Sequence, residues 1–280
     1  MSGAAPTEPI VVTGSTGSIG GAAAKSLAAQ GRSLILLARD PAKGADVREQ
    51  ILHASHGVEV EVVPCDLSSM SSVRTAAAAI TSHHPKLGGL IHCAAVFAKE
   101  RRETPDGFEL MFATNHLGPF LVTRELLGPL RAGAPSRVLT VSAPSTTELD
   151  FEDLQSARKF GSLTAFGATK TANLLFAYAL AHRMAGTGVT SNVFFPGLVR
   201  SKLMQEAPAI VRGLAGLAAR KPEEAGSALA WLAVDPALGE TTGRFFKLRK
   251  PDDSSAYSRD AGVQQRLWDV SERLLGVGSA

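Results

Sequence analysis

The 280-residue sequence contains only two cysteines, Cys65 and Cys93, and it lacks an uninterrupted apolar run of the roughly 18 residues that a membrane-spanning helix requires. Two cysteines are too few for a disulfide framework or a cysteine-rich metal site, so we expect no metal and a reducing, cytoplasmic compartment. The missing apolar run argues against stable insertion in a membrane. Residues 1–9 are polar and lack the apolar core of a secretory signal.

The sequence also lacks a large excess of positive or negative charge. The net charge is +3, and Lys and Arg are scattered along the chain rather than grouped in blocks. This distribution does not indicate a nucleic-acid partner. The contents of 45% hydrophobic and 20% charged residues are ordinary for a globular protein that buries a sizeable core.

Short apolar runs alternate with helical stretches from end to end, which predicts βαβ units and a parallel sheet. The expected strands are nearly continuous in apolar residues, as in strands covered on both faces. They are Pro9–Thr13, Ser33–Ala38, Val58–Pro64, Leu90–Cys93, Ser136–Ser142, Val189–Phe195 and Gly243–Leu248. The expected helices include Ile19–Gln30, Val47–His56, Ser71–Thr81, Leu117–Leu130 and Ala165–Met184. We therefore predict one α/β domain over residues 1–280, a Rossmann-type doubly wound parallel sheet of about seven strands with helices on both faces.

A glycine-rich segment follows the first expected strand. Residues 13–20 read TGSTGSIG and lead directly into the first expected helix. Glycines at such a place permit a tight turn, close approach of the backbone to a pyrophosphate, and close packing of helix on strand. The helix N-terminus adds free N–H groups and a partial positive charge. The pattern predicts a dinucleotide site, with a plain glycine turn as the alternative.

The end of the second expected strand indicates which dinucleotide is bound. Arg39 stands where an acidic residue would bind the ribose 2′-hydroxyl of NAD, and this favours NADP(H), with Lys43 as a further candidate contact. The alternative is that Arg39 pairs only with Asp40 or solvent. After the third expected strand, Asp66 is placed to accept a hydrogen bond from the adenine amino group.

Several ordered motifs carry a resemblance to a known family. They read LARD at 37–40, TPDGFE at 104–109, NHLGPF at 115–120, PSRV at 135–138, KTANLLF at 170–176, PGLV at 196–199 and RLWDV at 266–270. Over nearly the whole chain they resemble the short-chain dehydrogenase/reductase family, and within it the retinol-dehydrogenase-like branch. The resemblance implies a cofactor site made of Gly14, Ser15, Thr16, Gly17, Ser18, Ile19, Gly20, Arg39, Asp66, Leu67, Ala94, Ala95, Asn115, Lys170, Pro196, Gly197, Leu198, Val199 and Ser201.

Two departures from the family pattern concern the cofactor site. Ser18 replaces a usual glycine, and residues 92–95 read HCAA where the family usually has Asn-Asn-Ala-Gly. Both changes are compatible with a bound dinucleotide, because small residues remain where the backbone contacts fall. We interpret His92 as a structural residue at a strand end and Cys93 as a small buried hydrophobic residue rather than a nucleophile.

A third departure concerns the reaction. The resemblance implies catalysis by a tyrosine that donates the proton, a lysine four residues later, a serine that donates a second hydrogen bond, and an asparagine. Asn115 and Lys170 match the asparagine and the lysine, whereas Phe166 and Ala143 occupy the tyrosine and serine positions. Phenylalanine and alanine have no proton to give. Lys170 itself or a neighbouring group (Ser142, Ser145, Thr169 or His116) is a candidate replacement.

Three functions remain open from the sequence. The favoured one is a biosynthetic enzyme that binds NADP(H) and transfers a hydride to or from a bulky apolar small molecule without the usual serine and tyrosine. A cyclase, isomerase or dehydratase that uses the same pocket is the second. A protein that binds NADP(H) or a ligand without turnover is the third, and it includes an engineered inactive variant.

The remaining expectations concern the substrate pocket and the assembly. Phe97, Phe195, Leu198 and the segment Leu203–Leu217 are expected to line an apolar pocket, with residues 200–222 as its lid. A homodimer is an open alternative, because helices corresponding to Leu117–Leu130 and Ala165–Met184 form the dimer face in many members of the family.

Overall fold

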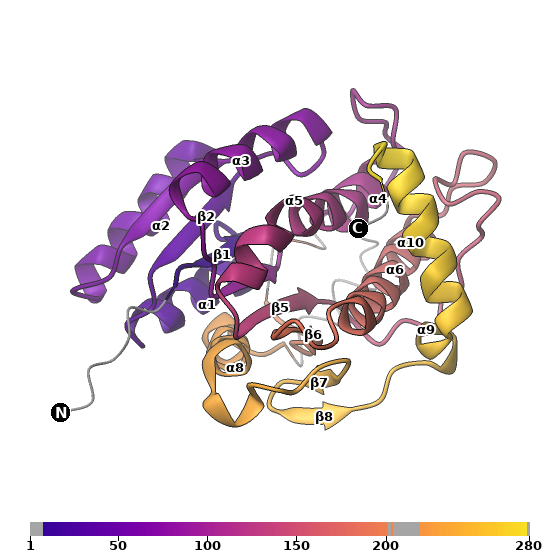
Figure 1. Cartoon of the computed structure of the whole chain (residues 1–280). Coiled ribbons are helices and arrows are strands. Elements are labelled where there is room, and N and C mark those ends of the chain that lie inside the picture. Colours follow the sequence, from indigo (N-terminus) through magenta and orange to yellow (C-terminus); the bar gives the residue numbers. More distant parts are fainter. Residues whose placement is uncertain (1–7, 201–202, 204–218, 279–280) are drawn as a thin grey trace.

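The computed structural model describes residues 8–200, 203 and 219–278, and its centre is one eight-stranded sheet (Figure 1). The strand order is β3-β2-β1-β4-β5-β6-β7-β8. The strands are β1 Ile10–Thr13, β2 Leu34–Ala38, β3 Val60–Pro64, β4 Gly89–His92, β5 Ser136–Val141, β6 Val189–Phe195, β7 Phe245–Lys247 and β8 Lys250–Asp252. All neighbouring pairs are parallel except β7 with β8. The predicted parallel sheet is confirmed.

The eighth strand is a difference from the prediction. Residues Lys250–Asp252 pair antiparallel with β7 at the edge of the sheet and are all exposed. An exposed edge strand of three residues has neither the apolar run nor the alternation that marks a strand in a sequence. The seven expected strands are all present, most of them shortened by one to three residues.

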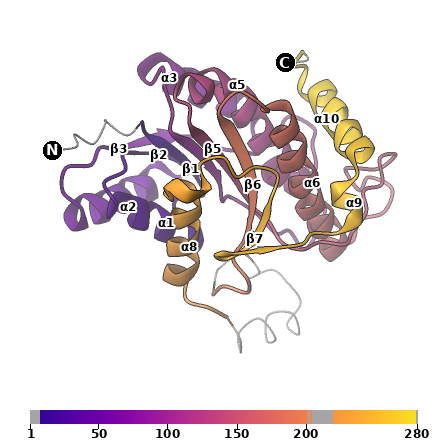
Figure 2. The ribbon, with the colours of Figure 1, turned by 60° about the horizontal axis from the view of Figure 1, so that its bottom comes forward.

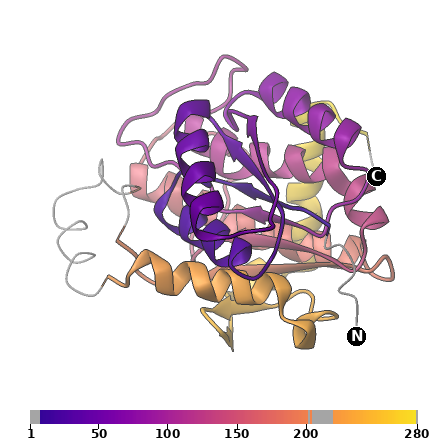
Figure 3. The ribbon, with the colours of Figure 1, turned by 90° about the vertical axis from the view of Figure 1, so that its left-hand side faces the viewer.

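Helices cover both faces of the sheet, as a doubly wound fold requires. Figures 2 and 3 show α1 and α8 side by side on one face, and α3, α5 and α6 on the other. The helices are α1 Ser18–Ala28, α2 Pro41–Ala54, α3 Met70–His83, α4 Leu110–Phe112, α5 Gly118–Ala132, α6 Ser162–Arg183, α8 Pro222–Val234, α9 Ala256–Arg259 and α10 Ala261–Leu275. Between α4 and α5, Ala113–Leu117 form a π-helical turn.

The strand order reverses at β1, the first strand of the chain, which pairs with β2 on one side and with β4 on the other. In open α/β sheets ligands bind in the crevice at this switch point, beyond the carboxyl ends of the strands. The loops after β1 and β4 meet there. The fold therefore places the glycine-rich segment and residues 92–95 on one cleft.

Helix α10 lies against α5 and α6 and buries Trp268 between them (Figure 1). The Trp268 ring centroid is 4.7 Å from that of Phe120 and 6.1 Å from that of Phe176, and the Arg183 guanidinium lies 4.3 Å from the Trp268 ring centroid. The surfaces of α5 and α6 beneath α10 are thus already packed within the chain. A homodimer stays a prediction, and it requires a surface other than the one that α10 covers.

The proposed lid falls largely outside the described residues, which between 200 and 222 comprise residue 200, residue 203 and residues 219–222. Leu203 packs against an apolar cluster, and Val199 forms an isolated bridge with Arg220. In the part of the chain that the structure describes, no helix is long and apolar enough to cross a membrane.

Candidate functional site

At two positions of the turn after β1 only glycine fits. Gly14 has φ +67°, and a Cβ there would lie 2.6 Å from the backbone N of Ala94. A Cβ on Gly20 would lie 2.3 Å from the carbonyl oxygen of Gly14. Real Cβ atoms do not approach backbone so closely, so both glycines are required by packing between β1, the loop after β4 and α1. The sequence prediction of a tight turn with close helix–strand packing is confirmed.

The N-terminus of α1 opens onto this turn without a cap. Gly17 is the N-cap residue, no side chain accepts a hydrogen bond from the first turn, and the first turn has no acidic residue. The first intrahelical bond runs from Gly21 N to Gly17 O. The amides of Ser18, Ile19 and Gly20 therefore have no acceptor within the helix and are free to bind an anion.

A cleft of about 1120 Å³ lies in front of these amides. It is lined by the predicted residues Gly14, Ser15, Thr16, Gly17, Ser18, Ile19, Gly20, Arg39, Asp66, Leu67, Ala94 and Ala95. Pro222, Glu223 and Ser227 of α8 line it as well and were missed, because no sequence pattern identified α8 as a helix beside the glycine turn. An uncapped helix start and a cleft of this volume fit the phosphates and the size of a dinucleotide.

Arg39 lies exposed at the end of β2 and lines the cleft. Asp40 does not pair with it: the Asp40 carboxylate accepts hydrogen bonds from Ala42 N and Lys43 N as the cap of α2, and Lys43 Nζ lies 3.2 Å from Asp40 Oδ2. These contacts hold the pKa of Asp40 below its ordinary value, with the Lys43 backbone hydrogen bond as the main cause. Among the described residues the Arg39 guanidinium has no ion-pair partner, so the alternative of an Arg39–Asp40 pair is wrong.

The other predicted cofactor contacts differ in their placement. Asp66 Oδ1 accepts hydrogen bonds from Ser68 N at 2.9 Å and Ser68 Oγ at 2.7 Å. Pro196–Val199 follow β6 but are not among the cleft-lining residues, and the Leu198 side chain is 53% exposed. Ser201 lies outside the described residues.

Asn115 sits in the π-helical turn and is fully buried. Its Oδ1 accepts a hydrogen bond from Val96 N at 2.8 Å, and its Nδ2 donates to Val96 O at 3.0 Å and to Thr169 Oγ1 at 3.1 Å. One side chain thus ties the loop after β4 to α6. π-turns of this kind occur frequently at functional sites.

Lys170 lies one helical turn after Phe166 on α6, with Nζ 5.1 Å from the centroid of the Phe166 ring. Burial lowers the pKa of Lys170 from 10.5 to about 8, opposed in part by an attraction to Cys93. Among the described residues Nζ has no hydrogen-bond partner. The Phe166 ring in turn meets the Phe97 ring edge to face at 5.5 Å between centroids. Lys170, Asn115 and Phe166 do not line the cleft themselves; through Cys93, Val96 and Phe97 they adjoin its wall.

The hydroxyl groups near Lys170 all donate to backbone carbonyls. Ser142 Oγ donates to Lys170 O at 2.9 Å, Ser145 Oγ to Gly167 O at 2.8 Å, and Thr169 Oγ1 to Phe166 O at 2.8 Å. Ser142 and Ser145 thereby hold the loop after β5 to α6, and Thr169 bonds within α6. Ser142, named above as a candidate donor, thus bonds to the backbone of α6.

The two histidines near the site are structural. His116 is buried, with Nε2 2.8 Å from Ser271 Oγ of α10, and His92 is buried with Nε2 2.7 Å from Thr123 Oγ1 of α5. Burial lowers the pKa of each imidazole from 6.5 to about 3. Both imidazoles are therefore neutral near pH 7, and neither supplies the acidic proton of an imidazolium. Burial likewise raises the pKa of Cys93 to about 12, which keeps its thiol protonated.

An apolar cluster surrounds Phe166. Its buried members are Phe97, Ala98, Met111 and Ala165, and Val96, Leu110, Phe160, Phe166 and Leu203 pack against it. The prediction that Phe97 belongs here is confirmed, whereas Phe195 is misplaced: it packs against Phe245 at the β6–β7 end, in a separate cluster. Phe195 is the last residue of β6. Side chains along a strand alternate between the two faces of the sheet, and the sequence does not show which face Phe195 takes.

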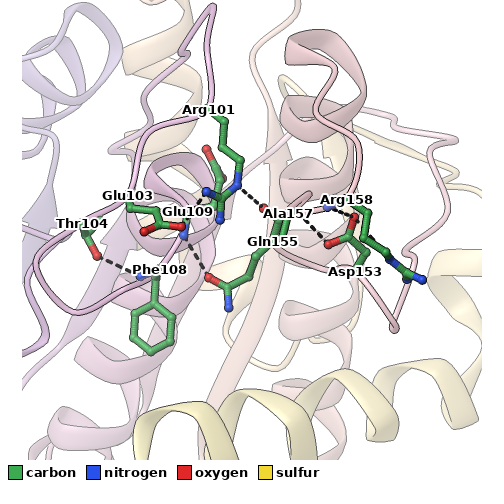
Figure 4. A network of polar contacts seen from close by, with 9 residues as sticks. All are labelled: Arg101, Glu103, Thr104, Phe108, Glu109, Asp153, Gln155, Ala157 and Arg158. Atoms are coloured by element: carbon green, nitrogen blue, oxygen red, sulfur yellow. Dashed lines mark hydrogen bonds and ion pairs between the residues drawn. The ribbon is translucent and has the colours of Figure 1, made fainter.

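Two long loops frame this cluster and are fastened to each other (Figure 4). Gln155 Oε1 accepts a hydrogen bond from Glu109 N at 2.9 Å, and the Gln155 carbonyl accepts one from Arg101 Nε at 3.2 Å. Arg101 also pairs with Glu103 at 2.6 Å, and Asp153 accepts from the amides that follow it, Ala157 N among them. Hydrogen bonds therefore join the loop after β4 to the loop after β5.

Comparison with known proteins identifies relatives over nearly the full chain. Residues 8–210 match the short chain dehydrogenase family. Retinol dehydrogenase 14 of Mus musculus is 34% identical over 286 aligned positions, which cover 96% of this chain and 86% of the relative. Retinol dehydrogenase 13 of Homo sapiens is 33% identical over 283 positions, which cover 97% and 86% respectively.

Solved structures agree in fold. The crystal structure of an uncharacterized protein from Mycobacterium Paratuberculosis has a TM-score of 0.75 at 28% identity, and the comparison covers 96% of this chain and 94% of that one. A 3-ketoacyl-(acyl-carrier-protein) reductase from Brucella melitensis complexed with NADH has a TM-score of 0.68 at 21% identity, covering 92% and 98%. A metagenomic short-chain oxidoreductase in complex with NADP has a TM-score of 0.65 at 22% identity, covering 86% and 96%.

Proposed function

The chain belongs to the short-chain dehydrogenase family, and on this basis we propose that it is an NADP(H)-dependent oxidoreductase acting on a bulky apolar alcohol or carbonyl compound. The observation that carries the proposal is the uncapped N-terminus of α1 above two obligatory glycines, in a cleft of about 1120 Å³. Bound NADP(H) would exchange a hydride with the substrate. The proposed location is the cytoplasm.

The preference for NADP(H) over NAD(H) rests on Arg39. Its guanidinium lines the cleft at the end of β2, and the neighbouring carboxylate of Asp40 is engaged by α2. A 2′-phosphate placed there would form a charge-assisted hydrogen bond with Arg39, typically worth about 1.5–3 kcal/mol. An NAD(H) ribose carries no charge to meet it.

Calorimetric titration with NADPH and NADH tests the assignment. The native chain should bind NADPH more tightly, and Arg39→Ala should reduce the difference by roughly 1–3 kcal/mol. Lys43→Ala is the matched control, because its ammonium already pairs with Asp40, and it should change the difference less than Arg39→Ala does. Equal affinity of the native chain for both cofactors would refute the role of Arg39.

An apolar substrate is supported by Val96, Phe97 and Leu203, which line the cleft and belong to the apolar cluster around Phe166. Pockets of this composition bind ligands mainly through buried apolar surface. The relatives named as retinol dehydrogenases agree with a substrate class of this kind. A thermal-shift screen should favour long-chain or polycyclic compounds over sugars and small acids.

The reaction is proposed to proceed without the family's serine and tyrosine, whose positions we assign to Ala143 and Phe166. Loss of a positioned acid typically lowers the rate by about 10²–10⁴, and loss of one oxyanion donor by about 10²–10³. Lys170 is the remaining proton donor in this proposal, since burial lowers its pKa to about 8 while leaving Nζ protonated in most molecules at neutral pH. Asn115 positions α6 beside the loop after β4 through Val96 and Thr169.

Among the residues that the structure describes, no free hydroxyl group lies beside Lys170. This favours a second candidate, a protein that binds NADP(H) and an apolar ligand without reducing generic carbonyls, or with a non-redox reaction in the same pocket. The hydroxyls of Ser142, Ser145 and Thr169 are each committed to a backbone carbonyl. Turnover of NADPH by the native chain with a panel of apolar aldehydes and ketones separates the candidates, because only the oxidoreductase consumes the cofactor.

A further inference from the structure

Residues 104–109, the TPDGFE motif, form a tight turn in the loop after β4. Thr104 N donates a hydrogen bond to Phe108 O at 2.8 Å, and Gly107 N donates to Thr104 O at 2.9 Å with φ +79° at the glycine. The Thr104 hydroxyl accepts a further hydrogen bond from Phe108 N at 3.3 Å (Figure 4). These bonds fix the turn that carries the exposed residue Asp106.

Asp106 binds the start of α3, 36 residues earlier in the chain. Its Oδ2 accepts a hydrogen bond from Met70 N at 2.8 Å. Met70 is the first residue of α3, so its amide has no acceptor within the helix. The first turn of α3 has no acidic residue of its own, and the Ser69 hydroxyl accepts from Ser72 N at only 3.4 Å. A different loop therefore supplies the carboxylate that stabilises this helix N-terminus.

The first turn of α3 holds the segment that follows β3. Asp66 N donates to Ser72 Oγ at 3.0 Å, and Ser69 N donates to Asp66 O at 3.0 Å. On the other side α5 begins against Leu67, because a Cβ on Gly118 would lie 2.4 Å from Leu67 O. Asp66 and Leu67 both line the cleft. The position of their backbone therefore depends on where α3 begins.

Asp66 and Leu67 lie at the adenosine end of the cleft. The strand order β3-β2-β1 places the carboxyl ends of these three strands in a row. A dinucleotide with its pyrophosphate at the N-terminus of α1 and its 2′-phosphate at Arg39 would extend toward the end of β3. Its base would there meet the segment that α3 holds in place.

We propose that Asp106 is a positioning residue for the adenosine half of the cofactor. Its carboxylate fixes the first turn of α3, and that turn fixes the backbone of Asp66 and Leu67. Asp106 is not among the residues that line the cleft, so it acts through α3 without touching the cofactor. The role rests on the proposed binding of NADP(H), and it adds a determinant of affinity that lies outside the cleft.

Calorimetric titration of the native chain and Asp106→Ala with NADPH, NADH and adenosine 2′,5′-bisphosphate tests the role. Asp106→Ala should weaken the binding of all three by a similar factor, about three- to tenfold, because all contain the adenosine half. A charge effect would have the opposite sign, since loss of a carboxylate favours the binding of anions. Reduced nicotinamide mononucleotide lacks the adenosine half and should bind both proteins alike. Asp106→Asn keeps an oxygen that accepts from Met70 N and should retain most of the affinity.

Two further variants test the route through α3. Ser72→Ala removes the hydroxyl that binds Asp66 N, and its combination with Asp106→Ala should lose less affinity than the product of the two single losses, because both act on one segment. Glu103→Ala removes another carboxylate of the same loop, which pairs with Arg101, and should leave the affinities unchanged. Hydrogen exchange without cofactor should be faster in Asp106→Ala at residues 66–73 and unchanged in α5.

The outcomes separate this role from the proposed function. If the native chain binds NADPH and adenosine 2′,5′-bisphosphate and Asp106→Ala binds them equally well, the role of Asp106 is overturned alone. Equal weakening of reduced nicotinamide mononucleotide would also overturn it, because that result indicates a general disturbance of the fold. A native chain that binds neither NADPH nor NADH would overturn the proposed function and this role together.

Discussion

Two imidazoles buried in the helical layer should make the protein sensitive to mild acid. His92 and His116 are 3% and 1% exposed, and burial lowers the pKa of each from 6.5 to about 3. Each ring uses one nitrogen in a hydrogen bond, to Thr123 and Ser271 respectively, while its Nδ1 has no partner. A proton added to either ring would therefore create a charge within an apolar layer.

The direction in which the free energy of unfolding changes with pH follows from the pKa values of the folded and unfolded chain. Between about pH 6.5 and pH 3 these histidines bind protons in the unfolded chain but not in the folded chain. The stability that is present above pH 6.5 is therefore lost as the pH falls. Each histidine contributes a slope that approaches about 1.4 kcal/mol per pH unit, or about 2 kcal/mol between pH 7 and pH 5. Together the two should reduce the free energy of unfolding by about 4 kcal/mol over that interval. Glu109 acts in the opposite direction, because burial raises its pKa.

Urea denaturation followed by tryptophan fluorescence at a series of pH values measures this loss. His116→Gln and His92→Gln retain a hydrogen-bonding side chain but do not titrate, so each should halve the part of the pH dependence that the two histidines contribute. The contribution of Glu109 is common to all proteins compared and cancels. His56→Gln, at an exposed position in the turn after α2, is the matched control and should leave the pH dependence unchanged.

The reasoning fails if the single variants keep the native pH dependence between pH 7 and pH 5. It also fails if the loss is no larger in the native chain than in the double variant His92→Gln with His116→Gln. A loss of stability at constant slope would only report the replacement of the side chains. The slope is therefore the quantity that decides.

Three further predictions follow from the site and the packing. Ala143→Ser combined with Phe166→Tyr should restore NADPH-dependent reduction of generic apolar aldehydes, measured by loss of absorbance of NADPH; a variant that binds NADPH but stays inert would favour the non-redox or non-catalytic candidate. Gly20→Ala should abolish detectable NADPH binding in calorimetry, because its Cβ would lie 2.3 Å from the Gly14 carbonyl oxygen. Trp268→Ala should lower the free energy of unfolding by about 3–5 kcal/mol in urea titrations, and a cost below 1 kcal/mol would contradict the packing of α10 on α5 and α6.

The sequence by itself determined the sheet and the glycine turn, because both depend on short-range patterns. Nearly continuous apolar runs identified seven strands, and the glycines at 14 and 20 indicated a backbone approach that the structure shows to be obligatory. Asn115 and Lys170 were also singled out from motifs that are local in the chain. These features are readable because each depends on neighbours within a few residues.

Only the tertiary structure decided what surrounds those residues. Asp40 caps α2 and leaves Arg39 unpaired. Three hydroxyls near Lys170 bond to backbone carbonyls, and Lys170 itself has no polar partner among the described residues. These contacts depend on how the folded chain places each side chain. The same holds for α10, which covers helices that the sequence left available for a dimer. Hydrogen-bond partners and burial set the pKa of a group and the access to it, and both arise from contacts between segments far apart in the chain, which no local pattern encodes.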